Sequence, residues 1–111
     1  MPPNITGIAH VELSVTELDR SVDWYCRLLG ARDVWRGANE GGGYKFSPLV
    51  PGLEHLSFRV ADRAAIDAWA VWMDEIGVAQ DAVNDSGPAV TLNLRDPDGI
   101  ALEFYYLPPR Q

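Results

Sequence analysis

Apolar and polar positions alternate in two short segments, one near the start of the chain and one near its middle. In segment 8–15 the alternation places Val11, Leu13 and Val15 on one face of an extended chain. In segment 53–60 three apolar residues occupy the corresponding positions, namely Leu56, Phe58 and Val60. Alternation with a period of two is typical of a half-buried strand, so each segment predicts one β-strand.

A helical repeat follows each predicted strand. The first helix is expected to start after Thr16, a residue type that caps helices, and to end at Gly30. Its apolar stripe consists of Leu18, Val22, Tyr25 and Leu29. The second helix is expected between Asp62 as its cap and Gly77 as its stop. Its stripe consists of Ile66, Trp69, Ala70, Met73 and Ile76. This spacing predicts that each helix buries one face.

Three further strands are predicted after the second helix, over 78–83, 89–95 and 100–107. Turn-forming residues separate these strands at 84–88 and 96–99. The second half of the chain is therefore expected to have the order β-α-β-β-β.

The first half of the chain is shorter, because only residues 31–54 separate its helix from His55. One strand over 32–36 fits this stretch, and a second, short strand can be placed around 44–50. Gly41–Gly43 lie between them. Three successive glycines fit either a natural short loop or a deleted or engineered hairpin, and the sequence leaves both open.

The two halves are related by an internal repeat with an offset of 45 residues. This offset superposes His10 on His55 and Trp24 on Trp69. The chain has two histidines, and both lie opposite the apolar face of their predicted strands. The repeat therefore gives the histidines equivalent positions in two similar modules.

Glu103 lies between apolar residues in the last predicted strand. A carboxylate there is costly to bury unless it is paired, hydrogen-bonded or bound to a metal. With His10 and His55 it makes the two-histidine, one-carboxylate set that holds a divalent metal with open positions. Iron, manganese, nickel, cobalt and zinc all suit these ligands. The alternative is that all three are exposed strand residues.

Length, charge and cysteine content restrict the class of protein. The chain has 111 residues, the size of one domain, and its net charge of −7 disfavours nucleic acid and anionic membranes. No apolar run reaches the length of a membrane span, and the start of the chain lacks a signal-peptide pattern. The single cysteine, Cys26, fits a reducing compartment. We expect one cytoplasmic domain over residues 1–111 that binds neither nucleic acid nor membrane.

Four ordered segments resemble the glyoxalase, bleomycin-resistance and extradiol-dioxygenase superfamily, also called vicinal oxygen chelate proteins. They are residues 10–15, 18–30, 54–60 and 96–104. The resemblance implies an α+β fold in which paired β-α-β-β-β modules form a curved mixed sheet around a small-molecule pocket. Module one would span about 5–50, shortened near 37–46, and module two about 51–108.

The resemblance also implies a metal site. Proteins of this superfamily take metal ligands from the first strand of each module and from the last strand, and those positions match His10, His55 and Glu103. Two departures bear on the reaction. Segment 44–50 has no carboxylate to serve as the fourth ligand of glyoxalase I, and the chain has no third histidine to serve as the acid–base residue of extradiol dioxygenases.

These features lead to one preferred function and two alternatives. We expect a divalent-metal-dependent lyase, isomerase or dioxygenase that chelates adjacent oxygens of a small substrate, with Tyr105 and Glu12 as candidates for proton transfer. The alternatives are a non-catalytic, antibiotic-sequestering binding protein and an inactive, shortened or engineered form of the fold. Unpaired strand edges in the shortened module also predict a homodimer.

Overall fold

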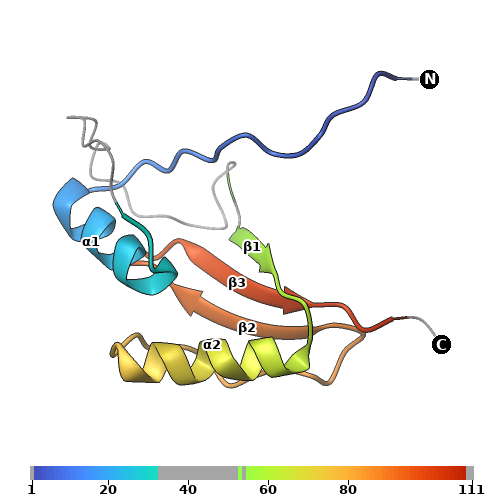
Figure 1. Ribbon diagram of the computed structural model, residues 1–111. Helices are drawn as coiled ribbons and strands as arrows, with labels where there is room; N and C mark the ends of the chain where they lie inside the picture. Colours follow the sequence, from blue (N-terminus) through green and yellow to red (C-terminus); the bar gives the residue numbers. More distant parts are fainter. Residues whose placement is uncertain (1, 33–52, 54, 110–111) are drawn as a thin grey trace.

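The computed structural model describes residues 2–32, 53 and 55–109, which form an α+β arrangement of two helices and a three-stranded sheet. In chain order the elements are α1 (Leu18–Leu29), β1 (His55–Arg59), α2 (Arg63–Glu75), β2 (Val90–Arg95) and β3 (Ala101–Tyr106). Strand β3 is central, parallel to β1 and antiparallel to β2 (Figure 1). Neither helix in these residues has the length and apolar character of a membrane span.

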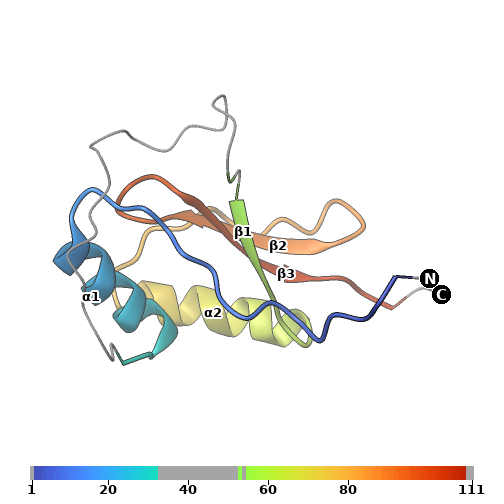
Figure 2. The same ribbon diagram turned by 90° about the horizontal axis from the view of Figure 1, so that it is seen from above.

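The core lies between the sheet and α2. Helix α2 contacts β2 and β3, and α1 lies beside it near one end of the sheet (Figures 1 and 2). The largest fully buried side chains are Leu28, Ile66, Met73, Leu92, Leu102 and Phe104. The Trp69 ring stacks on Phe104 with centroids 4.3 Å apart, and Trp72 Nε1 donates a hydrogen bond to the Leu28 carbonyl oxygen at 2.8 Å. These contacts join both helices to the sheet.

The two helices start differently. Helix α2 begins as predicted, because an Asp62 carboxylate oxygen accepts a hydrogen bond from the backbone N–H three residues later at 2.8 Å. The prediction of Thr16 as the cap of α1 is wrong: the N-cap is Glu17, which makes no side-chain cap hydrogen bond. Thr16 Oγ1 donates to the carboxylate of Asp98 instead. At its other end α1 stops as predicted at Gly30, whose φ is 63°.

Asp98, in the turn between β2 and β3, fixes the start of α1. Its Oδ1 accepts hydrogen bonds from Thr16 N at 3.2 Å and from Arg20 Nη2 at 3.3 Å. Its Oδ2 accepts another from Ser21 Oγ at 3.3 Å. The Asp98 side chain is only 7% exposed, so these donors replace the water that its carboxylate would otherwise bind.

Asp96 in the same turn fixes the middle of α1. Its Oδ2 accepts a hydrogen bond from the Tyr25 hydroxyl at 2.7 Å, and its Oδ1 accepts two backbone N–H groups at 2.8 Å. Burial, followed by the hydrogen bond to Asp96, raises the pKa of Tyr25 well above its ordinary value. The turn therefore anchors α1 through two carboxylates on successive helical turns.

Segment 8–15 is not a strand in the structure, so that prediction is wrong. The segment has no regular structure and runs past the other elements without a strand beside it in the described residues (Figure 1). Ile8 is 82% exposed and Val11 is 47% exposed, whereas Val15 is buried. A strand needs a neighbour to hydrogen-bond with, and segment 8–15 pairs with none of the three described strands.

Segment 78–83 also departs from its predicted strand. It touches β2 through an isolated bridge of Gln80 with Leu94, and a second bridge, Asn84 with Thr91, follows directly after the segment. Between the two bridges the three residues 81–83 lie against only two residues of β2, 92 and 93, so an extra residue interrupts the ladder as in a β-bulge. The predicted strands 53–60, 89–95 and 100–107 appear as β1, β2 and β3. The predicted strands at 32–36 and 44–50, and Gly41–Gly43, lie largely or wholly outside the described residues.

Candidate functional site

The face of the sheet opposite α2 carries the polar side chains of all three strands. Strand alternation places His55, Ser57 and Arg59 of β1 on this face. The register then sets Glu103 directly opposite Ser57 and Tyr105 directly opposite Arg59. In β2 and β3 every second residue is apolar and points to the core. The polar residues between them therefore lie together on the opposite face.

These five residues line one polar pocket of about 370 Å³. Ser57 Oγ donates a hydrogen bond to Glu103 Oε1 at 2.8 Å. The pocket therefore brings together two of the three predicted metal ligands, His55 and Glu103, and one predicted proton-transfer residue, Tyr105.

His10 and Glu12 lie elsewhere, on the irregular N-terminal segment. Their side chains are 74% and 89% exposed, and His10 Nε2 lies 3.6 Å from Glu12 Oε1. Neither residue lines the polar pocket. In the part of the chain that the structure describes, no three His, Cys, Asp or Glu side chains are close enough to hold a metal ion together. The three-ligand set of His10, His55 and Glu103 stays a prediction.

The pocket fits a divalent metal as an incomplete site. An imidazole and a carboxylate on adjacent strands are suitable donors, and they face one open polar hollow. Glu103 uses one oxygen for Ser57, so its other oxygen is available for a metal. The lining of this pocket contains one imidazole and one carboxylate, so a second imidazole would come from a residue outside it.

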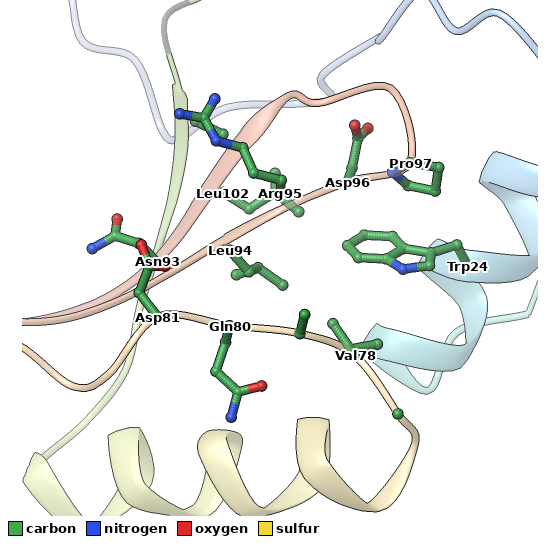
Figure 3. Close-up of a pocket in the computed structure, with 13 residues that line it drawn as sticks. Trp24, Val78, Gln80, Asp81, Asn93, Leu94, Arg95, Asp96, Pro97 and Leu102 are labelled. Carbon is green, nitrogen blue, oxygen red and sulfur yellow. The ribbon is translucent and has the colours of Figure 1, made fainter.

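A second hollow, of about 760 Å³, opens at the end of the sheet near α1. Figure 3 shows Trp24, Val78 and Leu94 pointing toward one another at its centre. Asn93 and Arg95 lie on its side nearer the polar face, since they pair with Glu103 and Ala101 in the register. The polar side chains do not converge on the centre of this hollow (Figure 3).

A third hollow, of about 460 Å³, is mainly apolar. It lies between the N-terminal segment, α1 and β1, and its walls include Leu13, Val22 and Phe58. Cys26 also lines it. An apolar hollow of this size can take a small organic molecule.

The sequence pattern alone indicated no role for Ser57 or Arg59. The signal was available, because both share the alternation of β1 with His55. What the sequence lacked was the register of β1 against β3, which alone sets Ser57 against Glu103.

Comparison with known proteins identifies the class. The family model for the glyoxalase/bleomycin resistance protein/dioxygenase superfamily matches residues 7–104, and the chain belongs to this superfamily. A structure of a glyoxylase/bleomycin resistance protein/dioxygenase domain from Frankia sp. EAN1pec is 28% identical, with a TM-score of 0.80, covering 95% of this chain and 100% of that one. These matches confirm the superfamily and the α+β fold with a curved mixed sheet that the sequence predicted, and the short chain is consistent with a shortened first module.

Two relatives carry more specific names. Metallothiol transferase FosB from Staphylococcus epidermidis is 24% identical over 117 residues, which cover 91% of this chain and 84% of that protein. The fosfomycin resistance protein FosX from Listeria monocytogenes is 15% identical with a TM-score of 0.71, covering 93% of this chain and 94% of that one. The structural match to FosX shows the common fold alone.

Proposed function

We propose that this protein is a divalent-metal-dependent enzyme that chelates adjacent oxygens of a small substrate. The observation that carries the proposal is the shared pocket of His55 and Glu103 on the open face of the sheet. The relative named metallothiol transferase supports a metal-dependent activity within the superfamily. A bound metal would act as a Lewis acid that stabilises negative charge on the substrate oxygens.

The residues of the polar pocket are proposed to have different roles. His55 and Glu103 would hold the metal, and Tyr105, which lines the same pocket, would donate a hydrogen bond or a proton to a substrate oxygen. Arg59 lines the same pocket, so a substrate whose oxygen donors carry negative charge is favoured there.

His10 is the proposed third ligand, with Glu12 beside it as a proton-transfer residue. The N-terminal segment is exposed, which supports a metal site whose His10 belongs to a second copy of the chain rather than to the same chain. In a two-fold dimer each N-terminal segment would complete the site of its partner.

Calorimetric titration with nickel, cobalt, manganese, zinc or iron(II) tests this function. We expect about one ion per chain, and a loss of most of the affinity in His55→Ala and Glu103→Gln because each removes a ligand. Glu75→Gln is the matched control, since Glu75 is exposed at the end of α2. Affinity should fall at acid pH, because imidazole binds a metal only when it is neutral. Absence of uptake of all five metals would contradict the proposal.

The apolar hollow favours a second candidate, a binding protein that sequesters a small apolar molecule without metal. Ligand binding that persists in the presence of a chelator and is weakened by Val22→Asp would support this candidate. Val22 lines the apolar hollow and is absent from the lining of the polar pocket, so the two functions give different results.

A further inference from the structure

We propose that Ser57 is a positioning residue that orients the carboxylate of Glu103 for metal binding. The proposal rests on the metal site proposed above and assigns a role to a residue outside the ligand set. Ser57 and Glu103 are direct partners in the register of β1 and β3. The Ser57 hydroxyl lies 2.8 Å from Glu103 Oε1 and donates a hydrogen bond to it.

The hydrogen bond decides which oxygen of Glu103 is free. A glutamate side chain rotates about three bonds, and on an open sheet face it samples many orientations. With Oε1 held by Ser57, the carboxylate is fixed and Oε2 alone is left without a hydrogen bond in the described residues. Glu103 would then bind a metal through one oxygen, and the remaining positions would stay open for substrate.

Strand geometry makes Ser57 suited to this role. Adjacent strands lie about 4.8 Å apart, so a short hydroxyl side chain reaches a carboxylate directly across from it without bending the backbone. The same position is exposed on the polar face, so the hydroxyl contributes little to the apolar core. A change at Ser57 is therefore expected to alter the site and leave the fold intact.

The test compares cobalt(II) binding by the full-length wild type and three variants. Ser57→Ala removes the hydroxyl and Ser57→Thr keeps it. Ser86→Ala removes another serine hydroxyl that donates a hydrogen bond at 2.8 Å, to Asn84 Oδ1, in the turn before β2 and outside the polar pocket. Calorimetry gives the affinity, the visible spectrum of bound cobalt reports its ligand geometry, and thermal unfolding reports the fold.

We expect Ser57→Ala to bind cobalt about tenfold more weakly, in line with the loss of other residues that hold metal ligands. Its cobalt spectrum should change, because Glu103 is then free to bind through both oxygens. Ser57→Thr and Ser86→Ala should match the wild type in affinity and spectrum, and all four proteins should melt at similar temperatures.

The outcomes separate this proposal from the proposed function. If the wild type binds cobalt and Ser57→Ala binds it equally well with the same spectrum, the role of Ser57 is overturned and the metal site stands. A similar loss in Ser86→Ala, or a loss in Ser57→Ala that follows a lower melting temperature, also overturns it. If the wild type binds no metal in any titration, the proposed function fails and this role fails with it.

Discussion

A hydrogen bond between Tyr25 and Asp96 joins α1 to the turn between β2 and β3. The Tyr25 hydroxyl is the donor at 2.7 Å to a carboxylate that is only 5% exposed. Tyr25→Phe removes this donor and leaves Asp96 Oδ2 buried without it. We expect a loss of about 1–3 kcal/mol in the free energy of unfolding at neutral pH, measured by urea denaturation. Tyr106→Phe is the control, because the described residues give its hydroxyl no hydrogen bond.

The same contact predicts how stability depends on pH. The folded state raises the pKa of Tyr25, mainly through burial and then through its hydrogen bond to Asp96. An unfolded tyrosine loses its proton near pH 10, so the stabilisation is complete below that pH and is lost as the pH rises further. Denaturation between pH 8 and 11 should therefore show falling stability in the wild type and a shallower decline in Tyr25→Phe. If the free energy of unfolding falls equally steeply with pH in both proteins, Tyr25 is not the cause of the decline.

At the residue scale, the sequence predicted part of the candidate site. His55, Glu103 and Tyr105 could be placed on one face, because strand alternation depends only on local spacing. The partnership of Ser57 with Glu103 depends on the register of two strands 46 residues apart, which no local pattern sets. The position of His10 could not be predicted for a related reason, since its segment has no strand beside it among the described residues.

At the scale of elements, the turn of Asp96 and Asp98 matters more for α1 than any cap on the helix itself. Asp98→Ala removes the acceptor of Thr16, Arg20 and Ser21 together. We expect a loss of about 2–3 kcal/mol in the free energy of unfolding, because several donors lose a charged partner. Chemical denaturation measures this loss, and helical circular dichroism shows whether α1 frays.

Asp85→Ala provides the control for that variant. Asp85 also pairs with an arginine, Arg63, at 2.7 Å, but both side chains are more than two-fifths exposed. Exposed ion pairs contribute less than about 1 kcal/mol, so this variant should be close to the wild type. Equal losses in Asp85→Ala and Asp98→Ala would show that the buried turn has no special role.

Element periodicity explains which parts of the fold were predictable. Helix α2 and strands β2 and β3 follow from apolar spacing, since each buries the face that its pattern marks. The predictions from the sequence were wrong where the local structure depends on contacts with residues distant in the chain. Thr16 binds Asp98, which is distant in the chain, and segment 78–83 meets β2 through a mismatch of one residue. The local pattern of apolar and polar residues indicates neither this contact nor this mismatch.

At the scale of the molecule, the N-terminal segment stands out because its apolar side chains are not covered within one chain. Ile5 is 89% exposed and Ile8 is 82% exposed, although the segment has the apolar alternation of a strand. We expect a homodimer in which this segment packs against a second copy. Light scattering over a hundredfold dilution should give a mass near twice 12.3 kDa. A mass of 12.3 kDa at every micromolar concentration would contradict the dimer.

A substitution pair tests whether the segment forms the interface. Ile8→Asp places a charge in the proposed contact and should shift the protein toward monomer at concentrations where the wild type is dimeric. Val71→Asp is the control, because Val71 is 57% exposed on α2, outside the N-terminal segment. Equal dissociation of both variants, or of neither, would place the interface elsewhere.

A mixing experiment then decides whether the partner supplies His10 to the metal site. His10→Ala and His55→Ala each lack one ligand, so neither should bind metal tightly alone. In a dimer with shared sites, a mixed pair joins the intact His10 of one chain to the intact His55 of the other and restores one site of two. Half of the dimers are mixed after random exchange, so uptake should recover to about a quarter of the wild-type value. If each site lies within one chain, no recovery is possible, because every chain in the mixture lacks a ligand. Recovery on unfolding and refolding the two variants together, and none on refolding each alone, would therefore establish that the sites lie between chains.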